Sequence, residues 1–309
     1  MRTPGSARRE PSRQAPTPSC AWCGRPLGPD AARLKGRTVC GSCGAATTDP
    51  WPSEDELSQA YEGWYRPAEG RFAGLGDRLL RRSRGALASR LDRVAPPGPV
   101  LDVGSGDGAL LDGLAAAGRE GVGLERHASR PDVLELEVGQ VRGRFAAIVF
   151  WHSLEHLPRP GEALKDAAAL LAPGGVMVIA APNLDSLQTR VFGDRWLALD
   201  LPRHLVHLPA RALVARLRGE GLRIERVSHL RGGQVVFGWL HGLVGTLPGR
   251  PDLYDAMRRA PARRSPMSRR RRVMTLAAGV ALLLPAAVAA VAEALVRRGG
   301  SMYVEARRG

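Results

Sequence analysis

The sequence has few aromatic residues, only two lysines and only four cysteines. Aromatic residues make up 5% of the 309 positions, so a hydrophobic core must consist mainly of alanine, leucine and valine. The hydrophobic content of 44% nevertheless excludes a wholly disordered chain. Four cysteines in so long a chain do not form the disulfide framework of a small secreted domain. Residues 1–19 lack an apolar stretch, so we expect a disordered basic tail in a reducing cytoplasm rather than a secretory signal.

The formal net charge of +15 comes almost entirely from arginine. Such a charge is typical of proteins that bind nucleic acid or an anionic membrane. The excess lies in residues 1–19, 249–272 and 297–309, whereas residues 20–248 are nearly balanced. Two of these basic stretches flank an apolar segment at residues 273–296. This distribution favours a membrane over nucleic acid as the partner.

The four cysteines form two Cys-x-x-Cys pairs, Cys20/Cys23 and Cys40/Cys43, each followed by glycine. Sixteen residues separate the pairs, which is the spacing of a zinc ribbon. Each pair can bind one side of a tetrahedral Zn²⁺, and four thiolates leave no position open for water. We therefore predict a structural zinc ribbon over residues 20–45. The alternative is two redox-active dithiols.

Residues 46–97 are expected to form a helical connector. Ser53-Glu-Asp-Glu56 has the spacing of a capping box at a helix start. Leucines near helical spacing predict a longer helix over Gly74–Val94, which ends before Pro96-Pro97. The leucines are Leu75, Leu79, Leu80, Leu87 and Leu91, and three aromatic residues, Tyr61, Trp64 and Tyr65, lie between the two helices.

Residues 98–309 alternate between short apolar strands and helices. Such alternation predicts an α/β fold with a parallel sheet and helices on both faces. The expected strands are 100–103, 121–124, 133–136, 146–150, 176–180, 221–227 and 300–306. Residues 164–171 are expected to be helical.

A glycine-rich loop, Gly104-Ser-Gly-Asp-Gly108, follows the first of these strands. Glycines at this position let a ligand approach the backbone at the carboxyl end of the sheet. Asp102 projects from the strand end and suits an ammonium group. Glu125 ends the next strand, where an acidic side chain can accept hydrogen bonds from both hydroxyls of a ribose. The loop differs from a dehydrogenase loop, Gly-x-Gly-x-x-Gly, because its third glycine comes one residue early.

Three ordered motifs over roughly residues 98–230 resemble the class I S-adenosylmethionine-dependent methyltransferases. They are Val100–Gly108, Phe145–Leu157 with its Leu-Glu-His-Leu segment, and Leu170–Ile179 with its Pro-Gly-Gly turn. The zinc ribbon and tyrosine-rich connector before this domain resemble a bacterial subgroup of that family. The resemblance implies a Rossmann-like fold and S-adenosylmethionine as cofactor.

The same resemblance implies roles for individual residues. Asp102 and Gly104 would hold the methionine end of the cofactor and Glu125 the ribose. The loop would be shaped by Ser105, Gly106 and Gly108, and the pocket would be bordered by Phe150, Trp151 and His152. The aspartate with which the family meets the adenine amine has no clear counterpart, and Glu135 and Glu137 are the nearest candidates.

His152-Ser-Leu-Glu-His156 also matches the H-x-x-E-H pattern of some zinc proteases. That pattern needs a helix, whereas this segment directly follows a buried strand, so we interpret the match as accidental. Some quinone-pathway methyltransferases of the family bind a metal in this loop, and His152, Glu155 and His156 offer ligands. We favour the simpler interpretation that Glu155 and His156 order the loop.

Two histidines are candidates for a catalytic base. His204 and His207 follow the fifth strand of the domain, in a segment that often covers the acceptor pocket of this fold. A neutral histidine can take a proton from a hydroxyl group during methyl transfer. His204 is our first choice and His207 the second, with loop ordering as the alternative for both.

An unusual insert, residues 232–298, separates the last two expected strands. Its segment Val273–Val296 has one charged residue, Glu293, and one proline, Pro285. As a helix it would extend roughly 36 Å, which exceeds the bilayer core of about 30 Å. The segment can dip into a membrane and return at Pro285, pair with Val235–Leu247 as two crossings, or lie as a helix against the protein. We favour membrane contact.

These features predict a methyltransferase at the inner face of the cell membrane. It would transfer a methyl group to an oxygen, or else a carbon or nitrogen, of a small or lipid-linked acceptor. The first alternative is an RNA methyltransferase that uses the ribbon and the arginine-rich tail. The second is a non-catalytic adaptor that retains the fold.

Overall fold

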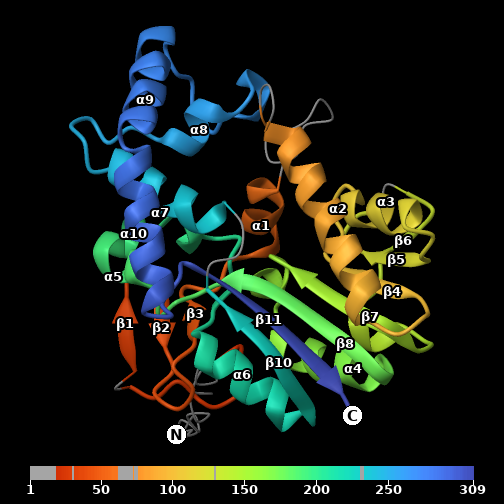
Figure 1. Ribbon diagram of the computed structural model, residues 1–309. Coiled ribbons are helices and arrows are strands. Elements are labelled where there is room, and N and C mark those ends of the chain that lie inside the picture. The colour runs from red at the N-terminus through yellow and green to blue at the C-terminus, as the bar shows by residue number, and fades with distance from the viewer. Residues whose placement is uncertain (1–18, 30, 62–71, 73–75, 129, 230–232) are drawn as a thin grey trace, which may run out of the picture.

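The computed structural model describes most of the chain (Figure 1). The described residues are 19–29, 31–61, 72, 76–128, 130–229 and 233–309. The predicted tail at residues 1–18 lies outside them, as do Trp64, Tyr65 and Leu75.

A seven-stranded sheet forms the centre, in the order β10-β11-β8-β7-β4-β5-β6 (Figure 1). Its strands are β4 (Val100–Val103), β5 (Gly121–Leu124), β6 (Val133–Leu134), β7 (Phe145–Trp151), β8 (Leu171–Pro182), β10 (Leu222–Ser228) and β11 (Ser301–Arg308). The strands from β6 to β8 are parallel, whereas β11 pairs antiparallel with both β8 and β10. The predicted Rossmann-like α/β class is therefore confirmed.

Two strands differ in length from the prediction. β6 ends at Leu134, two residues early, because only Val133 and Leu134 pair with β5. β8 extends to Pro182 because β11 pairs with it as far as that residue. Its start, Leu171, pairs with β7 ahead of the Pro-Gly-Gly turn.

Helices cover both faces of the sheet. The buried side chains of β7 alternate accordingly, with Ala147 and Val149 on one face and Ile148 and Phe150 on the other. The first face is covered by α2 (Gly76–Val94) and α3 (Ala109–Ala116), and the second by α4 (Pro160–Leu170) and α6 (Ala210–Gly219). Both layers are typical of a doubly wound fold.

The connector contains the predicted capping box. Ser53 caps α1 (Glu54–Ala60), and the side chain of Glu56 accepts a hydrogen bond from the Ser53 amide. In α2 only the second half packs on the sheet, so Leu87 is buried whereas Leu79 and Leu80 are exposed. The helix predicted from the leucine spacing is thus present, although only part of its length packs on the sheet.

The cysteine-containing segment forms a second, antiparallel sheet in the order β1-β2-β3-β9. Three of its strands are β1 (Ala32–Leu34), β2 (Arg37–Val39) and β3 (Ala46–Thr48), and residues 20–48 are called the ribbon region below. The fourth strand, β9 (Val206–His207), comes after β8 in the chain. Cys20, Trp22 and Cys40 belong to the same hydrophobic core as the α4/α6 face. The ribbon region is thus built into the larger domain through a shared strand and a shared core.

The described part of the insert contains the α-helices α7 (Gln234–Val244), α8 (Leu253–Met257), α9 (Arg269–Ala281) and α10 (Leu283–Leu295). α10 packs on α7, and α9 contacts α7 and α8. Figure 1 shows α9 and α10 one below the other along one side of the molecule. The segment thus forms two helices that pack on α7 and α8, and its contact with a membrane stays a prediction.

The apolar segment 273–296 bends at Leu282 rather than at Pro285. Pro285 falls in the first turn of α10, where a backbone N–H has no partner within the helix, so proline is tolerated there. In the described part of the chain, no single helix is long and apolar enough to span a bilayer. α9 and α10 meet that requirement only as a pair, with a bend of 51° between them.

Candidate functional site

The glycine-rich loop has the backbone that the sequence predicts. Gly104, Gly106 and Gly108 all have positive φ angles, between 64° and 78°. A Cβ atom at Gly104 would collide with the side chain of Ser153 in the loop after β7. Glycine is therefore required at this position for both its conformation and its lack of a side chain.

Glu125 joins the loop to the next strand. Its Oε2 atom accepts a hydrogen bond of 2.8 Å from the Gly106 amide, and its Oε1 atom accepts one of 3.0 Å from the Arg126 amide. The carboxylate expected to hold a ribose thus lies directly beside the loop expected to receive the rest of the nucleoside.

Asp102 is buried at the end of β4 and forms no hydrogen bond or ion pair with another described residue. Burial raises the pKa of its carboxyl to about 7, Arg84 opposes this shift, and Glu125 adds to it. The buried hydroxyl of Ser105 has no hydrogen-bond partner among the described residues either. A buried carboxyl that no described side chain hydrogen-bonds suits a ligand that brings its own ammonium group.

The two residues at the end of β7 point in different directions. The Trp151 ring packs against Tyr303, at 6.2 Å between centroids, and Arg84 lies 4.8 Å from its centroid. His152 has a positive φ of 53°, and its Nδ1 atom lies 3.4 Å from Glu155 Oε1. Trp151 and His152 are both predicted to contact the cofactor, and His152 also lies in a group of histidine and glutamate side chains.

That group is the histidine cluster, defined here as His152, Glu155, His156 and His204. Glu155 is buried in the short helix η2 (Leu154–His156), and neither carboxylate oxygen has a hydrogen-bond partner among the described residues. Burial alone would raise the pKa of Glu155, but His152, His204 and His156 lower it to about 2. Burial lowers the pKa of His156 to about 4, so its ring is neutral near pH 7.

The ligand atoms of Glu155, His156 and His204 lie within 4.8 Å of one another. The hydroxyl of Tyr61, at the end of α1, lies 2.8 Å from His156 Nδ1. No role was predicted for Tyr61, because its distance from Leu-Glu-His-Leu along the chain conceals this contact. The histidine cluster and the helical connector are therefore in contact through His156 and Tyr61.

His204 and His207 occupy different surroundings. His204 Nδ1 donates a hydrogen bond of 2.8 Å to the Ala198 carbonyl, so the other ring nitrogen, Nε2, carries the lone pair of the neutral ring. That atom lies 3.9 Å from Glu155 Oε1. His207 is buried in β9 with its Nε2 atom 3.4 Å from Thr48 Oγ1, and burial lowers its pKa to about 3. Of the two histidines, His204 is therefore the one whose Nε2 atom lies beside the Glu155 carboxylate.

The four cysteines lie together as predicted. The Sγ atoms of Cys20 and Cys43 are 3.7 Å apart, as are those of Cys23 and Cys40. All four sulfurs lie within 4.8 Å of one another. In a tetrahedral site with Zn–S bonds of about 2.3 Å, the sulfurs are about 3.8 Å apart. Donor type and spacing both fit Zn²⁺.

Neither candidate for the adenine contact is free of other interactions. Glu135 accepts a hydrogen bond of 2.7 Å from the Ala128 amide. Glu137 caps the short helix η1 (Val138–Gln140) and lies 3.5 Å from Arg159. The structure thus adds no support for either residue at the adenine.

Comparison with known proteins places this site in a family. Residues 79–227 match the model of a methyltransferase domain. The ubiquinone biosynthesis O-methyltransferase of Xanthomonas axonopodis pv. citri is 28% identical over 161 residues, which cover 44% of this chain and 67% of that protein. The protein of the same name from Alkalilimnicola ehrlichii is 30% identical over 124 residues, which cover 34% of this chain and 50% of that protein.

A solved S-adenosylmethionine-dependent methyltransferase from Archaeoglobus fulgidus aligns with 73% of this chain and 94% of its own. Its identity is 17% and its TM-score 0.44, values too low to add to the comparison. The domain match and the curated relatives agree with the glycine-rich loop and the sheet order. Residues 79–227 therefore form a methyltransferase domain of the class I S-adenosylmethionine-dependent type.

Proposed function

We propose that this enzyme methylates an oxygen atom of a lipid-linked acceptor, such as a quinone precursor, while it lies on a membrane surface. The choice of oxygen is supported by the relatives, which are named as O-methyltransferases of ubiquinone biosynthesis. The membrane surface is supported by one observation on this chain, the outward face of α9 and α10.

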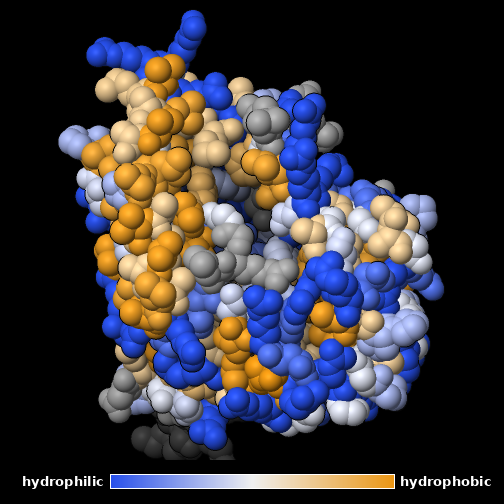
Figure 2. All heavy atoms as spheres, in the orientation of Figure 1, coloured by the Kyte–Doolittle hydropathy of each residue, from blue (hydrophilic) through white to orange (hydrophobic). Residues whose placement is uncertain are grey.

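That outward face carries large apolar side chains in unusual number. Figure 2 shows them as a continuous apolar band along the side formed by these helices. Val280, Leu284 and Leu295 are 77%, 74% and 79% exposed, respectively. The others are Val273, Met274, Leu283, Val288, Val291 and Val296. Exposed apolar surface of this extent is typical of an interaction site rather than of an ordinary protein surface.

The single acidic residue of the segment faces inward. Glu293 is fully buried, and its carboxylate accepts hydrogen bonds from the Gln188 amide and from Trp239 Nε1. The outward face is consequently free of acidic groups. Basic residues lie at both of its ends, Arg269–Arg272 and Arg297–Arg298. An apolar helix face between arginine clusters suits the interface of an anionic bilayer, with the helices in the membrane plane.

In this proposal the cofactor site uses the residues predicted from sequence. Asp102 would bind the ammonium group of S-adenosylmethionine and Glu125 its ribose hydroxyls, with the glycine-rich loop against the nucleoside. When bound, the cofactor supplies an electrophilic methyl group on its sulfonium. Proximity and alignment then account for most of the acceleration of an in-line transfer.

His204 is the proposed base. Its Nε2 atom would take the proton of the acceptor hydroxyl as the oxygen–methyl bond forms. Glu155 lies close enough to stabilise the resulting imidazolium. His207 would instead stabilise the junction between the ribbon region and the domain, and the four cysteines would hold a structural Zn²⁺.

The reaction can be tested by transfer of a labelled methyl group. Purified, zinc-loaded protein is incubated with methyl-labelled cofactor and separate lipid, small-molecule and RNA fractions of cells. We expect label in the lipid fraction, and its loss in the Asp102→Asn/Glu125→Gln variant. Label confined to RNA would contradict the proposed acceptor, and no label in any fraction would favour a non-catalytic adaptor.

Membrane binding can be tested separately by flotation with anionic vesicles. A variant with Leu284, Val288 and Leu295 changed to serine should lose flotation. A control with Leu79, Leu80 and Val191 changed to serine removes other apolar side chains, which are 60%, 45% and 58% exposed, and should float normally. Equal flotation of both variants and the unmodified protein would refute the proposed membrane surface.

A further inference from the structure

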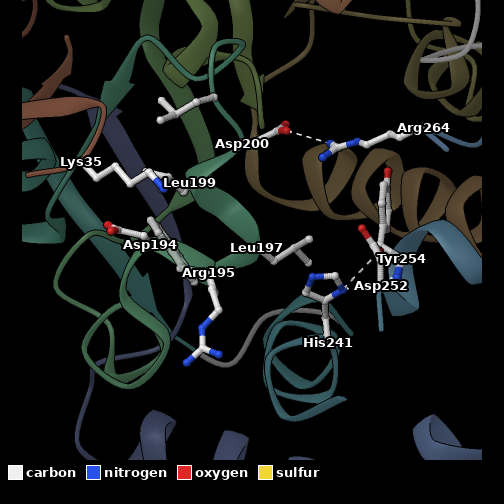
Figure 3. Close-up of a pocket in the computed structure, with 12 residues that line it drawn as sticks. Lys35, Asp194, Arg195, Leu197, Leu199, Asp200, His241, Asp252, Tyr254 and Arg264 are labelled. Carbon is white, nitrogen blue, oxygen red and sulfur yellow. Dashed lines mark hydrogen bonds and ion pairs between the residues drawn. The ribbon is translucent and has the colours of Figure 1, made fainter. Parts of the chain in front are cut away.

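A cavity of about 300 Å³ lies where the ribbon region, the segment after β8 and the insert meet (Figure 3). Lys35 reaches it from the turn between β1 and β2, Asp200 from the segment after β8, and Arg264 from the insert. This volume is at the lower end of the range for small-molecule sites. The glycine-rich loop does not contribute to its wall, so the cavity is separate from the residues that would hold the cofactor.

The acidic side chains of the wall already have partners. Asp194 lies 3.5 Å from Arg37, Asp200 pairs with Arg203 and Arg264, and Asp252 accepts a hydrogen bond from the Asp255 amide. The charged side chains of Lys35 and Arg195, by contrast, form no ion pair or hydrogen bond with any described residue. Both are exposed, and Figure 3 shows them with Asp194 on the side of the cavity opposite Arg264 and Tyr254. The wall therefore has two cations without a counter-charge.

Asp200 connects this cavity to the histidine cluster. Its backbone is left-handed, with a φ of 37°, and one carboxylate oxygen lies 3.7 Å from His204 Nε2. The other oxygen lies 3.0 Å from Arg264, at the cavity wall. A molecule in the cavity is thus separated from the proposed base by a single side chain.

We propose that this cavity binds an anionic group of the methyl acceptor, a phosphate or a carboxylate, through Lys35 and Arg195. This inference rests on the proposed function and adds a chemical requirement to it. The ribbon region and the insert would then both serve acceptor selection, because each contributes to the wall. Neither part would affect cofactor affinity.

The test measures calorimetric binding of inorganic pyrophosphate to the full-length, zinc-loaded protein at low salt. The variant Lys35→Ala/Arg195→Ala removes both cations of the wall. The control Arg33→Ala/Arg190→Ala removes the same charge from two exposed arginines in the neighbouring β1 and α5 (Leu187–Phe192), neither of which lines the cavity. Binding of S-adenosylmethionine to each sample verifies that the protein is folded.

We expect pyrophosphate to bind at least about tenfold more weakly to the cavity variant than to the control. Equal binding to both variants, or no binding to the unmodified protein, would overturn the proposed anion site. Lipid methylation that persists without pyrophosphate binding would overturn this inference alone and leave the proposed function intact. Pyrophosphate binding without methylation of any lipid would count against the proposed function instead.

A second arm identifies the source of the anion. If the site takes the headgroup of a membrane lipid, the cavity variant also loses affinity for phosphatidylglycerol vesicles relative to the control. If it takes the anionic group of a separate acceptor, vesicle binding is unchanged while pyrophosphate binding falls. Either result supports the site, provided that the control retains pyrophosphate binding.

Discussion

Replacing Glu293 with alanine should release α10 from the rest of the protein. Its carboxylate accepts three hydrogen bonds, of 3.0 Å from the Gln188 amide, 3.0 Å from Gln188 Nε2 and 2.8 Å from Trp239 Nε1. All three residues are buried, so their donors cannot turn to water when the carboxylate is lost. Each hydrogen bond to a charged group contributes about 1.5–3 kcal/mol.

These contributions do not add fully, because Gln188 supplies two of the three donors. We therefore expect Glu293→Ala to cost about 3–5 kcal/mol, because it leaves three buried donors without an acceptor. At about 1.4 kcal/mol per tenfold change, the opening equilibrium of α10 would rise by roughly two to four orders of magnitude.

Hydrogen exchange of the amides in residues 283–295 measures this opening directly. Leu295→Ala is the matched control, because Leu295 lies on the same helix with its side chain 79% exposed and should cost little. Trp239→Phe removes one donor and should give an intermediate effect. If Glu293→Ala increased exchange no more than Leu295→Ala does, the inward carboxylate would not be what orients the helix.

Three further predictions concern the site. Burial raises the pKa of Asp102 from its ordinary 3.8 to about 7, so between these pH values the folded state retains a proton that the unfolded state has lost. The free energy of unfolding should therefore fall as the pH rises from about 4 to about 7, and cofactor affinity should rise through about pH 7. Asp102→Asn should abolish both trends in calorimetry. His204→Gln should lower kcat at least about 100-fold with unchanged cofactor affinity. His207→Gln should instead lower the melting temperature, because the buried His207 ring contacts Thr48 of the neighbouring strand β3. Chelation of the proposed Zn²⁺ should increase hydrogen exchange in β3 and β9, which pair with each other, and should reduce methyl transfer while cofactor binding persists. Unchanged exchange in β9 would contradict the proposed role of the cysteines.

The sequence predicts the cofactor half of the molecule well, because its signals are local. The strand, the glycine turn and Glu125 follow one another within about 25 residues, and each has a pattern fixed by backbone geometry. The cysteine pairs are similarly local. In both cases the structure assembles the residues in the expected arrangement.

The other half depends on contacts between distant parts of the chain. Nothing near Val206 indicates that it pairs with Thr47 of the ribbon region, because a two-residue strand has no periodicity to detect. The apolar segment at 273–296 has the composition of a membrane span, and only its packing reveals that Glu293 faces α7. The cavity is equally hidden, since its wall comes from three separate segments.

The position of β11 in the chain has a consequence for biosynthesis. This strand lies between β8 and β10 in the sheet, yet it is translated only after the whole insert. A growing chain therefore exposes an unpaired edge on β8 at the same time as the apolar helices emerge from the ribosome, and both features promote aggregation. Recombinant production should accordingly benefit from slow translation and from vesicles or mild detergent added before the polypeptide is complete.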